Sequence, residues 1–281
     1  MTSTPSTLAN GFEYGVRHLL SPREGRLSEI AHEALNIDVT ELLKLGAIYV
    51  EGNRTITEMD VREGDYIRVH TKPRRYNTEL GLWQERVLFQ DENFLVVNKP
   101  SGLPVHATVD NLVENLQTCL AKELGCEIFV THRLDVPTSG LIVFAKTREF
   151  LALFNHLLSS RQIKKIYRAK AQGKKLSPGL LKHYMMPSPR APKEVRLVAE
   201  DASWAECVLN ILTVDSDETT GVQTTTIELL TGRTHQIRAQ LAAAGAPILG
   251  DTQYGSEKLY DGDVIDLEAI SLSFLDFEFQ L

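Results

Sequence analysis

The sequence predicts an α+β protein with a mixed, largely antiparallel central sheet flanked by helices, preceded by a small α/β module. Apolar residues recur at helical spacing in some segments and form short strand-like runs in others. The two kinds of segment do not alternate regularly, as they do in doubly wound folds. The chain has 281 residues, 43% of them hydrophobic and 24% charged, which is typical of a globular protein with one large and one small domain.

The small module is expected at 23–72, after a tail at 1–22 whose first part is rich in Thr, Ser and Gly. Its first half has the apolar spacing of two helices, the second ending before Gly46, a residue suited to the position after a helix. Its second half has the short apolar runs and turns of strands. The expected elements are helices at 26–35 and 39–45 and strands at 47–50 and 61–69.

A linker at 73–84 leads to the larger domain, expected at 85–281. Short apolar runs predict its strands, and apolar residues three or four positions apart predict its helices. The expected strands are 87–89, 94–97, 128–130, 141–145, 163–171, 208–214 and 224–230, and the expected helices are 111–124, 148–158 and 236–244.

Several protein classes are excluded by missing patterns. No apolar run approaches the ~20 residues that span a bilayer, and residues 1–15 have no signal-peptide pattern. The three cysteines contain no C-x-x-C pair, which argues against a disulfide framework and a zinc site. No phosphate-binding or dinucleotide-binding glycine motif is present. We therefore expect a cytoplasmic monomer without metal, cofactor or membrane contact.

The charge is unevenly distributed along the chain. The net charge is -7, yet residues 161–196 carry eleven basic side chains and a single acid, Glu194. Such a basic segment fits a polyphosphate partner; a solvated face balanced by acidic neighbours is the alternative.

Two polar loops and one tyrosine are candidates for chemistry. In the loop at 132–140, Asp135 is either a reactive carboxylate or a residue that satisfies turn donors. Arg238 lies in the first turn of a predicted helix, the unfavourable end of the helix dipole for a cation, so we expect a carboxylate partner such as Asp135. Tyr167, in a basic strand, is either an active-site residue or a half-buried strand tyrosine.

Five motifs, in this order, closely resemble those of the RluA-type pseudouridine synthases. They are NKPSG at 98–102, HRLD at 132–135 followed by TSGL at 138–141, Tyr167 in its basic strand, TGRTHQIR at 231–238, and PILGD at 247–251 with Tyr254-Gly255. One departure is Gln240, where the family commonly has His before Leu241. The small module resembles, more weakly, an RNA-binding domain that precedes the catalytic domain in many of these enzymes. Because residues 26–72 hold six basic and nine acidic residues, docking or partner selection are alternative roles for it.

The resemblance implies a pseudouridine synthase-like catalytic domain at 85–281 that isomerises uridines of ribosomal or transfer RNA. Asp135 resembles the catalytic aspartate, Arg238 would hold it ionised, and Tyr167 matches the tyrosine that lies against the target base. A stacked base is out of reach, so the uridine must be flipped out of the helix, with Arg133 as the wedge that fills its place. The residues expected to bind the substrate are Arg133, His132, Arg233, His235, Lys165 and Leu249.

Two other functions fit parts of the sequence. A catalytically silent RNA-binding or chaperone protein would keep the same fold, although Asp135, Tyr167 and Arg238 are all present. A glycosidase acting on free nucleosides would use the same uracil pocket, although the basic segment at 161–196 favours a polymer.

Overall fold

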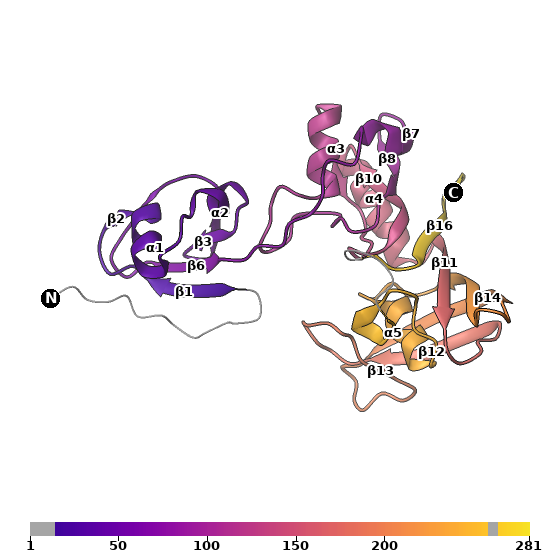
Figure 1. Cartoon of the computed structure of the whole chain (residues 1–281). Coiled ribbons are helices and arrows are strands. Elements are labelled where there is room, and N and C mark those ends of the chain that lie inside the picture. Colours follow the sequence, from indigo (N-terminus) through magenta and orange to yellow (C-terminus); the bar gives the residue numbers. More distant parts are fainter. Residues whose placement is uncertain (1–14, 258–263) are drawn as a thin grey trace. The chain divides into compact units, whose positions relative to one another are not determined.

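The computed structural model describes residues 15–257 and 264–281, which fall into two compact units (Figure 1). The small unit comprises Met1–Glu79 with His106–Cys119, and the large unit comprises Leu80–Val105 with Leu120–Leu281. The part of the predicted tail before residue 15 lies outside the described residues.

The small unit packs two helices on a four-stranded antiparallel sheet with the order β1-β6-β3-β4. Leu27, Ile30 and Ala31 recur at helical spacing and form the buried face of the first helix. A separate two-stranded pairing joins β2 to β5. The elements are β1 (Val16–Leu20), β2 (Gly25–Arg26), α1 (Leu27–Leu35), α2 (Thr40–Lys44), β3 (Ile48–Val50), β4 (Asn53–Thr55), β5 (Asp60–Val61) and β6 (Tyr66–His70). Both predicted helices are confirmed, and the strand predicted at 61–69 is divided between β5 and β6.

Strand β1 corrects the prediction of a tail that extends to residue 22. It pairs antiparallel with β6, from Val16 opposite His70 to Leu20 opposite Tyr66, and Leu19 is fully buried. The partner strand lies about fifty residues further along the chain. The strand therefore depends on a distant pairing, which local sequence patterns do not reveal.

Residues 106–119 belong to the small unit, although the sequence placed them in the larger domain. The backbone amide of Leu112 donates to the carbonyl of Leu45 at 2.7 Å, and the Tyr49 hydroxyl donates to the carbonyl of Val109 at 2.8 Å. The helix predicted at 111–124 begins only at Leu116, because the Asn115 side chain accepts the amide of Thr118 and caps that turn.

The large unit is built on an eleven-stranded mixed sheet, which confirms the predicted α+β class. Its main path has the order β13-β12-β14-β15-β11-β16-β10-β8-β7, with β17 beside β16 and β9 beside β10. Only the pairing of β10 with β16 is parallel among the described strands. The strands are β7 (Val87–Gln90), β8 (Phe94–Lys99), β9 (Phe129–Val130), β10 (Ser139–Ala145), β11 (Lys164–Gln172), β12 (Gly179–Met185), β13 (Val195–Arg196), β14 (Ala205–Ser216), β15 (Val222–Leu229), β16 (Leu267–Phe274) and β17 (Phe277–Gln280).

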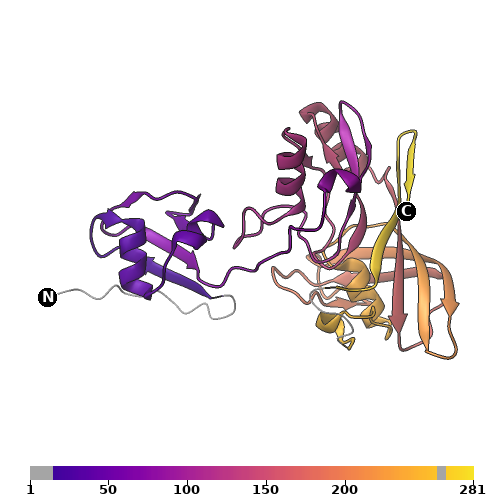
Figure 2. The ribbon, with the colours of Figure 1, turned by 45° about the horizontal axis from the view of Figure 1, so that its top comes forward.

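Helices cover two different parts of this sheet. The helices are η2 (Trp83–Arg86), α3 (Leu116–Leu124), α4 (Arg148–Ser159), α5 (Gln236–Ala243) and η3 (Thr252–Tyr254). In Figure 2, α4 (magenta) lies beside β8 and β10, whereas α5 (orange) lies against the strands of the second half of the chain. The core under α4 is aromatic, with the rings of Phe94 and Phe150 stacked at 4.5 Å. No described helix has the length and apolar character needed to cross a membrane.

Candidate active site

The loop that carries Asp135 connects β9 to β10 and is held by a second loop, which follows β8. The backbone amide of Gly102 donates to the carbonyl of Val136 at 2.9 Å, and the Ser101 hydroxyl donates to the carbonyl of Pro137 at 2.6 Å. The two loops therefore form one hydrogen-bonded assembly, which limits the positions open to the Asp135 backbone.

A buried lysine at the end of β8 completes this assembly. The fully buried Lys99 ammonium donates to the carbonyls of Pro100, Leu103 and Val136, at 2.8, 2.7 and 3.1 Å. Burial lowers the pKa of Lys99 to about 7, and the charge of Asp135 opposes this shift. Lys99 belongs to the NKPSG motif but was not among the site residues predicted from the sequence; the signal that could have identified it is a lysine at the end of a mostly apolar strand.

The structure explains why the TSGL motif has glycine at position 140. It has φ of 108°, and a side chain there would place its Cβ 2.3 Å from the carbonyl oxygen of Ala269. Gly140 and Ala269 are partners in the parallel pairing of β10 with β16. Glycine therefore permits the close strand approach directly after the Asp135 loop.

Arg238 is buried in the first turn of α5, with 5% of its side chain exposed. Its Nε donates to Oδ2 of Asp251 at 2.7 Å and its Nη2 to Oδ1 of the same residue at 2.9 Å. Nη2 also donates to Gln253 at 3.0 Å, and Nη1 lies 3.5 Å from Oδ2 of Asp135. The guanidinium is thus bonded at two nitrogens and directs the third toward Asp135.

This arrangement corrects the predicted pairing. The expected contact between Arg238 and Asp135 exists, but the principal carboxylate partner is Asp251, a residue of the PILGD motif for which no role was predicted. Desolvation acts against the charged guanidinium, yet the bonds from Asp251 raise the pKa of Arg238 above its ordinary value. A permanently charged group therefore faces Asp135.

A chain of buried amides orients α5. Gln236 donates to Gln240 at 2.9 Å, and Gln240 in turn donates to the carbonyl of Leu181 at 2.9 Å and to that of Cys207 at 3.2 Å. Gln240 also lies 3.2 Å from Nδ1 of His183. The glutamine at the position that departs from the family pattern therefore links α5 to β12 and β14.

His235 precedes α5 and lies between Asp135 and Tyr254. Its backbone is left-handed, with φ of 57°. Its Nδ1 is 3.1 Å from the Tyr254 hydroxyl, and its Nε2 is 4.0 Å from Oδ1 of Asp135. The Tyr254 hydroxyl also accepts the backbone amide of Lys193 at 2.8 Å. His235 of the TGRTHQIR motif, Tyr254 and the loop before β13 therefore lie close to Asp135, the candidate catalytic residue.

Tyr167 lies on β11 and is 6% exposed. Burial raises the pKa of its hydroxyl, and the negative charge of Asp135 raises it further. The hydroxyl therefore remains protonated at neutral pH. Asp135, Arg238, His235, Tyr167 and Lys99 thus form one electrostatically coupled group, hereafter the Asp135 cluster.

His132 occupies a place that differs from its predicted role in RNA binding. Its Nε2 accepts the backbone amide of Val143 at 3.2 Å, and its ring stacks on Phe154 with centroids 5.6 Å apart. Burial lowers the pKa of His132 to about 3, so the ring is neutral. These two contacts attach the start of the loop to β10 and α4.

The remaining predicted substrate-binding residues are dispersed around the cluster. Arg133 and Arg233 are exposed. Lys165 is partly buried, which lowers its pKa. Its Nζ lies close to Gly232, because a Cβ added to this glycine would be 3.4 Å from it. Leu249 is 8% exposed and lines the core. Within residues 15–257 and 264–281, no group of three or more His, Cys, Asp or Glu side chains could hold a metal ion.

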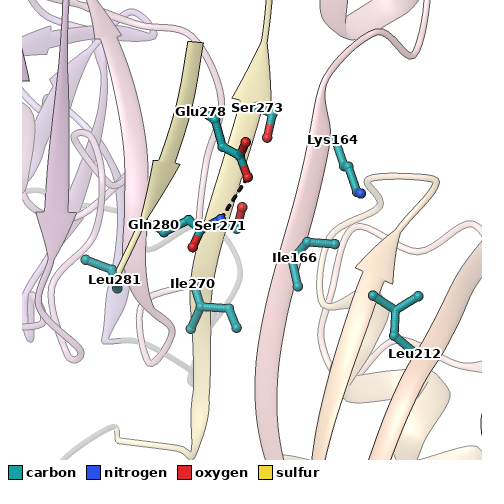
Figure 3. Close-up of a pocket in the computed structure, with 9 residues that line it drawn as sticks. All are labelled: Lys164, Ile166, Leu212, Ile270, Ser271, Ser273, Glu278, Gln280 and Leu281. Atoms are coloured by element: carbon teal, nitrogen blue, oxygen red, sulfur yellow. Dashed lines mark hydrogen bonds between the residues drawn. The ribbon is translucent and has the colours of Figure 1, made fainter.

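A separate pocket of about 310 Å³ lies between β11, β14, β16 and β17 (Figure 3). Lys164 and Ile166 of β11 line it, whereas the intervening Lys165 and the following Tyr167 do not. Side chains alternate between the two faces of a strand, so this pocket belongs to the sheet face away from Tyr167.

Comparisons with known proteins identify the family of the chain. The RNA pseudouridylate synthase family model matches residues 93–243. RNA pseudouridine synthase 6, chloroplastic, of Arabidopsis thaliana is 35% identical over 227 residues, which cover 71% of this chain and 47% of that protein. The chain thus spans about half the length of this relative. The dual-specificity RNA pseudouridine synthase RluA of Vibrio vulnificus is 33% identical over 204 residues, covering 68% of this chain and 78% of that protein.

The fold has a counterpart among solved structures. Human RNA Pseudouridylate Synthase Domain Containing 4 superposes with a TM-score of 0.59 at 23% identity, over 71% of this chain and 88% of that chain. This likeness concerns the fold, and the family match concerns the segment that contains Asp135, Tyr167 and Arg238. The chain belongs to the RNA pseudouridylate synthase family, as an RluA-type member.

Proposed function

We propose that this protein isomerises uridine to pseudouridine within RNA. The observation that carries the proposal is the position of Asp135, whose Oδ2 lies 3.5 Å from a guanidinium that Asp251 already holds in place. The fixed guanidinium therefore presents a positive charge to this carboxylate. The reaction needs an ionised carboxylate at its first step.

The overall reaction breaks the bond between N1 of uracil and C1′ of ribose and joins C5 to C1′. N1 gains a proton and C5 loses one, so no other reactant is consumed. A carboxylate at Asp135 serves each route considered for the family: attack on the sugar, attack on the uracil ring, or removal of a ribose proton. The Tyr167 hydroxyl keeps its own proton, so we place it against the target base and do not assign it the role of the base that removes the C5 proton.

We propose a structured RNA, ribosomal or transfer, as the substrate. A base in a stack is inaccessible and must be flipped out, and the exposed Arg133, two residues before Asp135, is placed to fill the gap. Exposed basic residues outside the face of β11 that carries Lys164, such as Arg233, Lys174 and Lys175, would contact phosphates, which predicts steep salt dependence of binding. We propose the cytoplasm as its location, supported by the three free cysteines Cys119, Cys126 and Cys207.

The test is incubation of the purified protein with RNA carrying tritium at C5 of uridine, without added metal or cofactor. Release of tritium reports the loss of the C5 hydrogen, and site-resolved mapping on total RNA from a strain lacking the gene identifies the uridine. Release that depends on Asp135 supports the proposal. RNA binding without release would move the assignment to a silent RNA-binding protein, and turnover of free nucleosides alone to a glycosidase.

A further inference from the structure

His235 is flanked by two groups that determine which of its nitrogens carries hydrogen. The phenol oxygen of Tyr254 accepts the backbone N–H of Lys193 at 2.8 Å, which leaves the Tyr254 O–H to donate elsewhere. The neighbour in its reach is Nδ1 of His235, at 3.1 Å. Burial raises the pKa of Tyr254 to about 12, so this hydroxyl keeps its proton at neutral pH.

A donating Tyr254 hydroxyl requires Nδ1 of His235 to be unprotonated. The hydrogen of a neutral imidazole then sits on Nε2. Desolvation lowers the pKa of His235, as do the charges of Arg238 and Lys193, and the charges of Asp135 and Asp251 oppose this without reversing it. The ring is therefore neutral at neutral pH, with an N–H that faces Asp135.

The two oxygens of Asp135 have different neighbours. Oδ2 faces Nη1 of Arg238 at 3.5 Å, and Oδ1 faces Nε2 of His235 at 4.0 Å. Lys99, Tyr167 and Tyr254 are the other titratable groups coupled to this carboxylate among the described residues. At 4.0 Å the imidazole contact is longer than a hydrogen bond, and contacts of this kind shorten when a substrate fills the site.

We propose that His235 is a positioning residue for Asp135, which it orients through Nε2–H in a tautomer selected by the Tyr254 hydroxyl. This inference rests on the proposed function and assigns to His235 a role other than the predicted contact with RNA. Once the Nε2 contact shortens to a hydrogen bond, the imidazole and the Arg238 guanidinium would together hold the carboxylate at both oxygens and fix its plane relative to the target nucleotide.

Two substitutions of His235 distinguish the effect of its N–H donor from the effect of its side-chain size. His235→Gln places an amide N–H near the position of Nε2, whereas His235→Met has similar length and no donor. We expect His235→Met to lower kcat by about a hundredfold, as for a displacement of about 1 Å in an active site. His235→Gln should recover most of kcat, and the Kd for RNA should stay within about twofold in both variants.

A measurement that needs no turnover tests the tautomer directly. In nitrogen-15 NMR spectra of the full chain, the ring of His235 should show hydrogen on Nε2, and Tyr254→Phe should abolish this preference. Tyr66→Phe is the matched control, because the Tyr66 hydroxyl lies 2.5 Å from Nδ1 of His18 in the small unit. This substitution should change the ring-nitrogen NMR signals of His18 and leave those of His235, and kcat, unchanged.

The results distinguish the two proposals. If the wild type releases no tritium, the proposed function fails, and the NMR result still decides the tautomer. Hydrogen on Nδ1 of His235, or a wild-type kcat in His235→Met, would overturn the inference. An equal rise of KM in both His235 variants, with kcat unchanged, would also overturn it and make His235 a contact for RNA.

Discussion

Arg238 and Asp251 form a buried bidentate ion pair, with bonds of 2.7 and 2.9 Å and side-chain exposures of 5% and 1%. The guanidinium also lies over the ring of Tyr254, 5.0 Å from its centroid. Because Asp251 engages Nε and Nη2, only Nη1 is directed at Asp135. The Asp251 carboxylate thus fixes the orientation of the Arg238 guanidinium, and the positive charge of that guanidinium acts on the Asp135 carboxylate.

Asp251→Asn is expected to reduce kcat by about a hundredfold while Asp135 remains in place. An amide directs either its oxygen or its NH₂ at each guanidinium nitrogen, so one of the two bonds is lost and Arg238 turns away from Asp135. Tritium release at saturating RNA measures this effect, and filter binding measures affinity, which should stay close to that of the wild type. Wild-type kcat would show that Asp251 does not aim Arg238.

The same pair should dominate local stability. Arg238→Met leaves the Asp251 carboxylate buried without its cation and should cost about 3–5 kcal/mol of unfolding free energy. The double variant Arg238→Met/Asp251→Leu should be more stable than Arg238→Met alone. Urea denaturation followed by tryptophan fluorescence measures both. Arg168→Met, at the solvent-exposed pair with Glu268, is the control and should cost at most about 1 kcal/mol; equal costs at the two sites would refute the prediction.

Asp135→Asn should abolish tritium release and leave the fold and the RNA affinity nearly unchanged. The side chain is 22% exposed and lies at the rim of the Arg238 site, so the amide fits without a buried unpaired group. Circular dichroism and RNA binding are measured beside activity. Turnover by a pure preparation of this variant would remove Asp135 from the catalytic role.

Lys99 should produce a pH dependence of stability of known sign. Its pKa is about 7 in the folded protein, against 10.5 as the ordinary value. Between these values the unfolded chain binds the additional proton, so the Lys99 contribution to stability rises with pH from about 7 to about 10. The unfolding free energy of the wild type minus that of Lys99→Met should therefore increase as the pH rises across this range.

The exposed Lys170 provides the control for that comparison. Lys170→Met should show a constant difference from the wild type over the same pH range. A constant difference for Lys99→Met as well would mean that the three carbonyl bonds keep the Lys99 ammonium charged throughout. Lys99→Met should also reduce kcat, because Lys99 joins the two loops that hold Asp135.

Deletion of residues 1–79 is expected to damage the rest of the chain. It would remove Arg74, which donates to the buried Asp110 at 2.9 and 3.0 Å, and Leu45, whose carbonyl accepts the amide of Leu112. The segment 106–119 would lose its packing partners. We expect a lower unfolding midpoint and aggregation on gel filtration; a monomeric truncation with the wild-type midpoint would show that this segment is stable without the small unit.

The sequence predicted well where the determining pattern is local. Helices α1 and α4 follow from apolar residues spaced three or four positions apart, and the hairpin of β14 and β15 follows from two apolar runs around a polar turn. The motifs identified Asp135 and Arg238 as residues of one site for the same reason, because each is a short contiguous pattern.

Strand β1, the allocation of 106–119 and the partner of Arg238 were decided by tertiary structure. Strand β1 exists because it pairs with β6, and helix α3 begins late because Asn115 caps it. Arg238 had two carboxylates in reach, and the folding of η3 against α5 placed Asp251 closer than Asp135. Periodicity records which face of an element is buried, whereas the strength of an ion pair or a strand pairing depends on distances of a few ångströms between segments far apart in the chain.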